Sequence, residues 1–164
     1  MKPALKQMLQ IGILVRDVEA SVKYFEEEFG MGPWETATMQ NAGPLEDLTI
    51  DGKPFDGVLA KMAFLHRFGF EIELIEPVGD SPYKTWIDEH GPGVHHIAFV
   101  TEDKYDDVLA KHKEKTGRDP WIRGQGMNNL MDFSYLDLRE EIGLLVECYR
   151  NIKPGRPALD YDPK

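Results

Sequence analysis

The feature that most constrains the fold of this chain is an internal repeat. A short apolar segment, residues 10–15 (Gln-Ile-Gly-Ile-Leu-Val), leads into an amphipathic stretch that ends at Gly30. Residues 96–101 (His-Ile-Ala-Phe-Val-Thr) lead in the same way into a stretch that ends at Gly117. This pattern is typical of a strand followed by a helix that a glycine terminates. The chain is therefore expected to contain two copies of one unit.

Three strand-like segments follow each predicted helix, and clusters of Gly, Pro and Asp that are typical of turns separate them. The segments are residues 34–40, 57–66 and 70–76 in the first half, and 120–124, 133–138 and 144–149 in the second. The repeated unit is therefore β-α-β-β-β. We expect an α+β fold in which the units pair into a curved mixed sheet, with a shared cleft and with helices on the outside. The predicted divisions are the first module, 8–77, a linker helix, 78–93, the second module, 94–150, and a C-terminal extension, 151–164.

The two-residue period of the predicted strands places four polar side chains on the sheet face opposite the helices. They are Gln10, Glu73, His96 and Glu147, and each module supplies one from its first strand and one from its last. Two modules related by a two-fold axis would bring the four together. Two carboxylates, an imidazole and an amide oxygen suit a divalent ion such as Zn²⁺, Ni²⁺, Co²⁺ or Mn²⁺. The alternative interpretation is a solvated face of an antiparallel sheet.

Composition excludes several classes of function. The 164 residues include 19 basic and 29 acidic side chains, and a net charge of −10 argues against nucleic-acid binding. No apolar run approaches the roughly 18 residues that span a bilayer. Cys148 is the single cysteine, so no internal disulfide is possible and a cytoplasmic location is expected. The expected partner is a small molecule, for which Met62, Arg123 and Tyr135 are candidate pocket residues.

The sequence resembles the vicinal oxygen chelate superfamily, which includes glyoxalase I, methylmalonyl-CoA epimerase, extradiol dioxygenases and bleomycin-resistance proteins. The resemblance covers nearly the whole chain, and four segments carry it: residues 10–13 (QIGI), 73–77 (ELIEP), 93–99 (GVHHIAF) and 146–147 (VE). It implies one divalent metal ion per chain, with Gln10, Glu73, His96 and Glu147 as ligands. The ligand set is similar to that of zinc-type glyoxalase I, which favours Zn²⁺. The surrounding sequence is more similar to methylmalonyl-CoA epimerase.

The resemblance also implies an activity: proton transfer next to a metal-chelated carbonyl, by an isomerase, epimerase or lyase acting on a small carbonyl compound or thioester. By similarity to glyoxalase I, Glu147 is the expected catalytic base. Leu14 stands where glyoxalase I typically has an arginine, and Ala60 stands where the epimerase has a second glutamate base. The alternative is a non-catalytic protein of the same fold that sequesters a small molecule. Members of the superfamily often dimerise, so a homodimer is expected.

Overall fold

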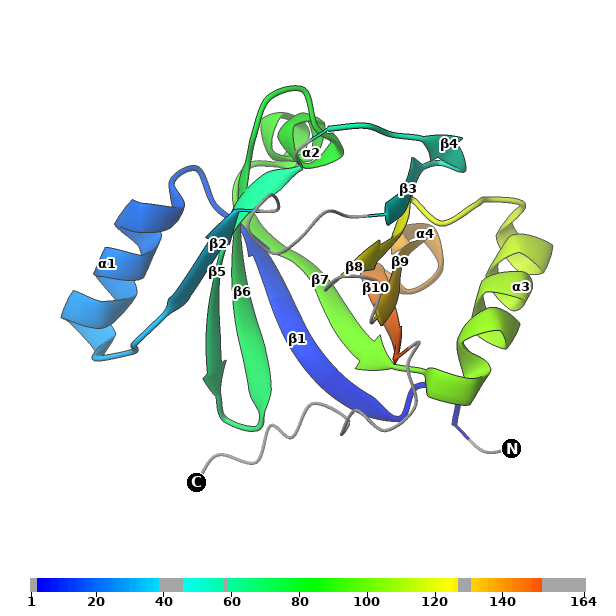
Figure 1. Cartoon of the computed structure of the whole chain (residues 1–164), viewed down its shortest axis with the longest axis horizontal. Helices are drawn as coiled ribbons and strands as arrows, with labels where there is room; N and C mark the ends of the chain where they lie inside the picture. Colours follow the sequence, from blue (N-terminus) through cyan, green and yellow to red (C-terminus); the bar gives the residue numbers. More distant parts are fainter. Residues whose placement is uncertain (1–2, 39–45, 58, 127–130, 152–164) are drawn as a thin grey trace.

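A computed structural model of the chain describes residues 3–38, 46–57, 59–126 and 131–151 (Figure 1). The helices are α1 (Val18–Phe29), α2 (Pro82–His90), α3 (Tyr105–Thr116) and the short α4 (Arg139–Ile142), and a 3-10 helix, Glu102–Lys104, precedes α3. The strands are β1 (Gln7–Leu14), β2 (Glu35–Thr38), β3 (Glu46–Ile50), β4 (Lys53–Pro54), β5 (Ala60–Arg67), β6 (Phe70–Pro77), β7 (Gly93–Val100), β8 (Ile122–Gly126), β9 (Met131–Leu138) and β10 (Leu144–Asn151).

The ten strands form one curved mixed sheet in the order β2-β5-β6-β1-β7-β10-β9-β8-β3-β4. The first strands of the two units, β1 and β7, pair antiparallel at its centre. The last strand of each unit pairs parallel with the first strand of the same unit: β6 with β1, and β10 with β7. Figure 1 shows α1 outside the first half and α3 outside the second. The predicted α+β fold of two paired modules is therefore confirmed.

Local sequence explains where the helices begin and end. The Asp17 side chain accepts a hydrogen bond from the Ala20 N–H, and Gly30 ends α1 in the left-handed conformation, with φ of 62°. The predicted linker helix corresponds to α2, for which Ser81 is the N-cap. The second repeat helix, α3, ends at Gly117 as expected. Each repeat helix covers an apolar outer face of the sheet, and Cys148 is buried beneath α3.

Two short strands, β3 and β4, were not predicted. The segment from Glu46 to Pro54 lacks regular apolar alternation, and its backbone turns at Asp51, which has a φ of 49°. Its position depends on tertiary contacts, since β3 pairs with β8 and the Leu48 side chain is buried in the inner core. A segment of the first module thus extends the half of the sheet that belongs to the second module. The predicted strand 34–40 corresponds to β2, which begins at Glu35. The residues of this prediction beyond 38 lie outside the described residues, as do 152–164 of the extension.

The inner side of the sheet carries an apolar cluster that α2 covers at one end of the molecule (Figure 1). Leu14, Met62 and Ile75 from the first module contribute to this cluster, together with Tyr83 of α2 and Tyr135 of β9. The polar residues described below lie on the same inner side. None of the helices in the described part of the chain is long and apolar enough to cross a bilayer. The cytoplasmic location stays a prediction.

Candidate functional site

The four predicted metal ligands project from four consecutive strands of the sheet. Glu73 lies on β6, Gln10 on β1, His96 on β7 and Glu147 on β10. Gly12 of β1 is aligned with both Glu73 and His96, and this register brings the four side chains to one face. All four are buried, with between 0% and 4% of the residue surface exposed. The structure therefore brings the predicted set together at the centre of the fold.

The Nε2 atom of His96 is the point on which this set converges. It lies 3.1 Å from Glu147 Oε2, 3.3 Å from Gln10 Oε1 and 3.5 Å from Glu73 Oε2. A tetrahedral ion with bonds of about 2.1 Å holds neighbouring ligand atoms about 3.4 Å apart, so the three separations match such a site. The His, Cys, Asp and Glu side chains of the described residues do not by themselves surround one point as a ready metal site. The amide oxygen of Gln10 would therefore have to be one of the ligands of an ion held here.

The two carboxylates of the site, those of Glu73 and Glu147, are buried, which makes their charged forms costly. Burial, followed by the nearby carboxylates of Glu147 and Glu71, raises the pKa of Glu73 well above its usual range. Within the described residues, neither Glu73 Oε2 nor Glu147 Oε2 has a hydrogen-bond partner. Buried carboxylates normally pair with a cation or bind a metal, because an unpaired charge is costly away from water. The chemistry of the donor atoms and these two oxygens fit a divalent ion.

The His96 ring occupies space that only a glycine leaves open. A Cβ atom added to Gly12 would lie 1.9 Å from His96 Cε1, which is less than any real contact. On the other side of the ring, His96 Nδ1 lies 3.0 Å from His95 Nδ1 in a hydrogen bond. A partner on the second nitrogen is the usual way to fix a histidine ligand. Gly12 and His95 together set the orientation of Nε2 toward the three oxygens.

This close contact predicts a large effect of Gly12→Ala. The added methyl group must displace the His96 ring, and overpacking of this kind costs about 1–3 kcal/mol of unfolding free energy. We expect urea denaturation to show a loss of unfolding free energy near the upper end of this range. NMR should show a change in the His96 ring resonances. The control is Gly69→Ala in the turn between β5 and β6, where an added Cβ meets no atom within 4 Å but the φ of 79° disfavours alanine. This control should lower stability through the backbone and leave the His96 ring resonances unchanged. Unchanged His96 resonances in Gly12→Ala would contradict the assigned packing.

His95 is a part of the site that the sequence did not single out. Its ring lies among aromatic rings, with centroid distances of 4.8 Å to Trp86, 5.2 Å to Trp121 and 5.3 Å to Tyr83. Burial, and then the neighbouring His96, lowers the pKa of His95 well below its usual range. His95 is therefore neutral, which allows the two Nδ1 atoms to share a single proton. The signal in the sequence was its place directly before a candidate ligand.

Of the predicted pocket residues, Tyr135 and Met62 lie on the inner side. The Tyr135 ring is 4.8 Å from the His96 ring, and the residue is aligned with Glu147 across β9 and β10. Its hydroxyl accepts a hydrogen bond of 3.0 Å from the Tyr83 hydroxyl. Met62 is aligned with Ile75 and is buried in the same apolar cluster as Tyr135.

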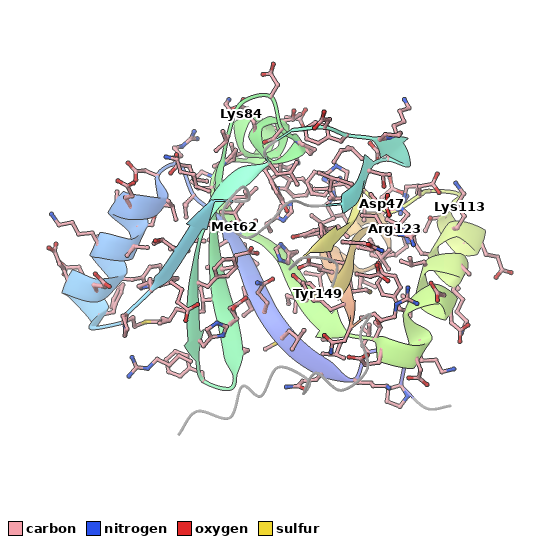
Figure 2. The ribbon with its side chains drawn as sticks, in the orientation of Figure 1. Asp47, Met62, Lys84, Lys113, Arg123 and Tyr149 are labelled. Carbon is pink, nitrogen blue, oxygen red and sulfur yellow. The ribbon has the colours of Figure 1, made fainter. Side chains whose placement is uncertain are left out.

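The prediction that Arg123 lines the pocket is wrong. Arg123 is aligned with Ser134 of β9, whose hydroxyl hydrogen-bonds Tyr105 of α3. Strand alternation therefore turns Arg123 to the side of α3, where Figure 2 shows it, and it is exposed. The inner positions of β8 belong to Ile122 and Gly124, which are both buried. An anionic substrate on the inner side would not meet this guanidinium group.

Two further polar residues adjoin the candidate ligands. Glu71 lies two positions before Glu73, is 8% exposed and accepts a hydrogen bond from Gln10 Nε2. Burial raises the pKa of Glu71 to about 7. Tyr149 lies two positions after Glu147, and burial, followed by the charge of Glu147, raises the pKa of Tyr149 well above its usual range. Spacing by two along a strand, which places side chains on one face, is the signal that could have identified both residues.

Comparison with known proteins agrees with this description. Residues 9–129 match the model of a family described as the glyoxalase/bleomycin resistance protein/dioxygenase superfamily. A Bacillus subtilis protein, the uncharacterized protein YqjC, is 25% identical over 147 residues, which are 87% of this chain and 91% of that protein.

Solved structures of methylmalonyl-CoA epimerases share the fold. One, a variant from Streptomyces coelicolor in complex with 2-nitronate-propionyl-CoA, has a TM-score of 0.63 and 24% identity, covering 91% of this chain and 99% of its own. The Mycobacterium tuberculosis enzyme has a TM-score of 0.64 and 16% identity, covering 93% of each chain.

Proposed function

Because the chain belongs to the glyoxalase/bleomycin resistance protein/dioxygenase superfamily, we propose that it is a metal-dependent enzyme that moves a proton on the carbon next to a carbonyl group. The observation that carries the proposal is the convergence of one amide and two carboxylate oxygens on His96 Nε2, all within 3.5 Å. Burial of all four residues favours a ligand set over a solvated sheet face. The proposed reaction is an isomerisation, an epimerisation or a lyase reaction.

The proposed metal ligands are Gln10 Oε1, Glu73, His96 Nε2 and Glu147. A divalent ion held there, with Zn²⁺ as the first choice, would polarise the substrate carbonyl and so make the neighbouring C–H group more acidic. Glu73 would stay a ligand. Gln10 is the weakest member of the set, since its amide oxygen carries no formal charge.

Glu147 is the proposed catalytic base. Its Oε2 atom has no hydrogen-bond partner among the described residues, and the side chain faces the inner side of the sheet. Tyr149 lies two positions further along β10, on the same face of the sheet as Glu147. Ala60 stands at the position that the resemblance aligns with the second base of the epimerase, and its methyl side chain cannot act as a base. A single base returns the proton mainly to one face or to the neighbouring carbon.

The proposed substrate is a small carbonyl compound or a thioester. Support comes from solved neighbours that bind coenzyme A thioesters: one contains methylmalonyl-CoA and another contains 2-nitronate-propionyl-CoA. The apolar inner cluster with Met62 and Tyr135 suits a short acyl group beside the candidate ligands. We also propose that the protein is a homodimer, for which light scattering should give twice the chain mass of 18.7 kDa.

The first test is the metal content of the purified protein. Protein prepared without chelator is expected to contain about one divalent ion per chain, because four buried donor groups converge on one site. Elemental analysis with matched protein concentration measures this ratio. Protein without tightly held metal would instead favour the alternative of a non-catalytic protein that sequesters a small molecule.

A further inference from the structure

We propose that Glu71 is a positioning residue, which turns the Gln10 amide so that its oxygen faces His96, and that His66 holds Glu71 in place from the solvent side. The inference rests on the proposed function, because Gln10 is a ligand only if the site binds metal. The resemblance implies that Gln10 is a metal ligand, but it assigns no role to Glu71 or His66.

The orientation of the Gln10 amide depends on what lies at each of its ends. Gln10 and Glu71 are aligned across β1 and β6, and Gln10 Nε2 donates a hydrogen bond to Glu71 Oε1. The other end of the amide, Oε1, lies 3.3 Å from His96 Nε2. Glu71 Oε1 is the acceptor of this hydrogen bond, and only the NH₂ end of an amide can donate, so an acceptor at this place selects that end. Without this acceptor, the amide could turn its NH₂ group toward the metal position and could not ligate.

Glu71 is itself held by a second partner. Its Oε2 atom lies 2.9 Å from His66 Nε2, and His66 is aligned with Glu71 across β5 and β6. The His66 side chain is 42% exposed and that of Glu71 is 10% exposed. A continuous row of side-chain contacts thus runs from His66 at the surface of β5 through Glu71 and Gln10 to His96 on β7.

The partners of the three buried glutamates distinguish their roles. Both oxygens of Glu71 have partners, one in Gln10 and one in His66. By contrast, Glu73 Oε2 and Glu147 Oε2 form no hydrogen bond within the described residues, and both lie close to the candidate ligand His96 Nε2, at 3.5 and 3.1 Å. Glu71 therefore contacts Gln10 and His66, while the other two glutamates each direct an oxygen toward His96 at the candidate site. This separates Glu71 from the ligands even though it lies only two residues from Glu73.

A pair of substitutions tests this role. Glu71→Gln keeps an oxygen that can accept from Gln10 Nε2, whereas Glu71→Leu has a similar size and no acceptor. Loss of a residue that orients a ligand typically lowers metal affinity 10–100-fold. We expect Glu71→Leu to weaken Co²⁺ binding to metal-free protein by about tenfold or more, and Glu71→Gln to bind within about threefold of wild type. Titration followed by the Co²⁺ absorption spectrum measures both.

A double-mutant cycle shows whether Glu71 acts through Gln10. In a Gln10→Ala background, Glu71→Leu should cause no further loss of Co²⁺ affinity. An equal loss in both backgrounds, or no loss in either, would overturn the proposal.

A readout that needs no metal separates this inference from the proposed function. In metal-free wild-type protein, NMR should show stronger nuclear Overhauser contacts from the Gln10 side-chain NH₂ to the Glu71 side chain than to the His96 ring. This order of intensities should be lost in Glu71→Leu. Stronger contacts from the NH₂ group to the His96 ring than to Glu71 in wild type would refute the assigned orientation, whether or not the protein binds metal. Correct contacts with no metal binding would leave the orientation in place and refute the metal site.

Discussion

Glu147→Gln is expected to lose proton exchange at the substrate carbon by a factor of about 10² or more, which is the usual contribution of a positioned general base. Glutamine keeps the shape of the side chain and one oxygen for the metal, but it cannot accept a proton at neutral pH. Most of the bound metal should therefore remain, since Glu73 and His96 are unchanged. Deuterium incorporation into a thioester substrate in D₂O, followed by NMR, measures the exchange.

The matched control for this substitution is Glu89→Gln on α2, which removes one exposed carboxylate that is not a candidate ligand. Its exchange rate should equal that of wild type. Normal exchange in Glu147→Gln, with metal retained, would remove Glu147 from the catalytic role and leave it a ligand only.

His96→Ala should abolish metal binding, with the metal content falling from about one ion per chain to less than about a tenth of this. His96 Nε2 is the atom shared by all three oxygen contacts, so its loss removes the centre of the set. Glu73→Ala should also lower the metal content, because it deletes one of the two carboxylates that face His96 Nε2.

Elemental analysis of these two variants is compared with that of His90→Ala, which removes an exposed imidazole from α2. This control should keep its metal, which would show that removing a histidine does not by itself lower the metal content. Full occupancy in His96→Ala or in Glu73→Ala would show that the ligands are assigned incorrectly.

The sequence was most informative where local pattern and global fold agree. The strand–helix repeat predicted two modules because residues 10–30 and 96–117 carry the same order of apolar run, helix and glycine. The two-residue strand period then placed Gln10, Glu73 and His96 on one face without knowledge of the pairing, because alternation is a property of each strand alone. The structure places these side chains within contact distance of one another.

Features that depend on register between strands could not be predicted in this way. The hydrogen bond from Gln10 to Glu71 requires that β1 and β6 align these two residues, and a shift by one residue would separate them. Arg123 was assigned to the pocket although its alignment with Ser134 turns it outward. Strand β3 has no clear pattern, because pairing with β8 and burial of Leu48 hold it in place.

The central claim, metal-dependent proton transfer, is tested most directly by deuterium exchange on methylmalonyl-CoA. The wild-type protein is incubated with this thioester in D₂O as purified, after removal of metal by a chelator, and after addition of Zn²⁺ or Co²⁺ to the stripped protein. We predict incorporation of deuterium at the acidic carbon, its loss when the metal is removed, and its return when metal is added. Exchange that persists at full rate in the metal-free protein, or that never exceeds the rate without protein, would contradict the account.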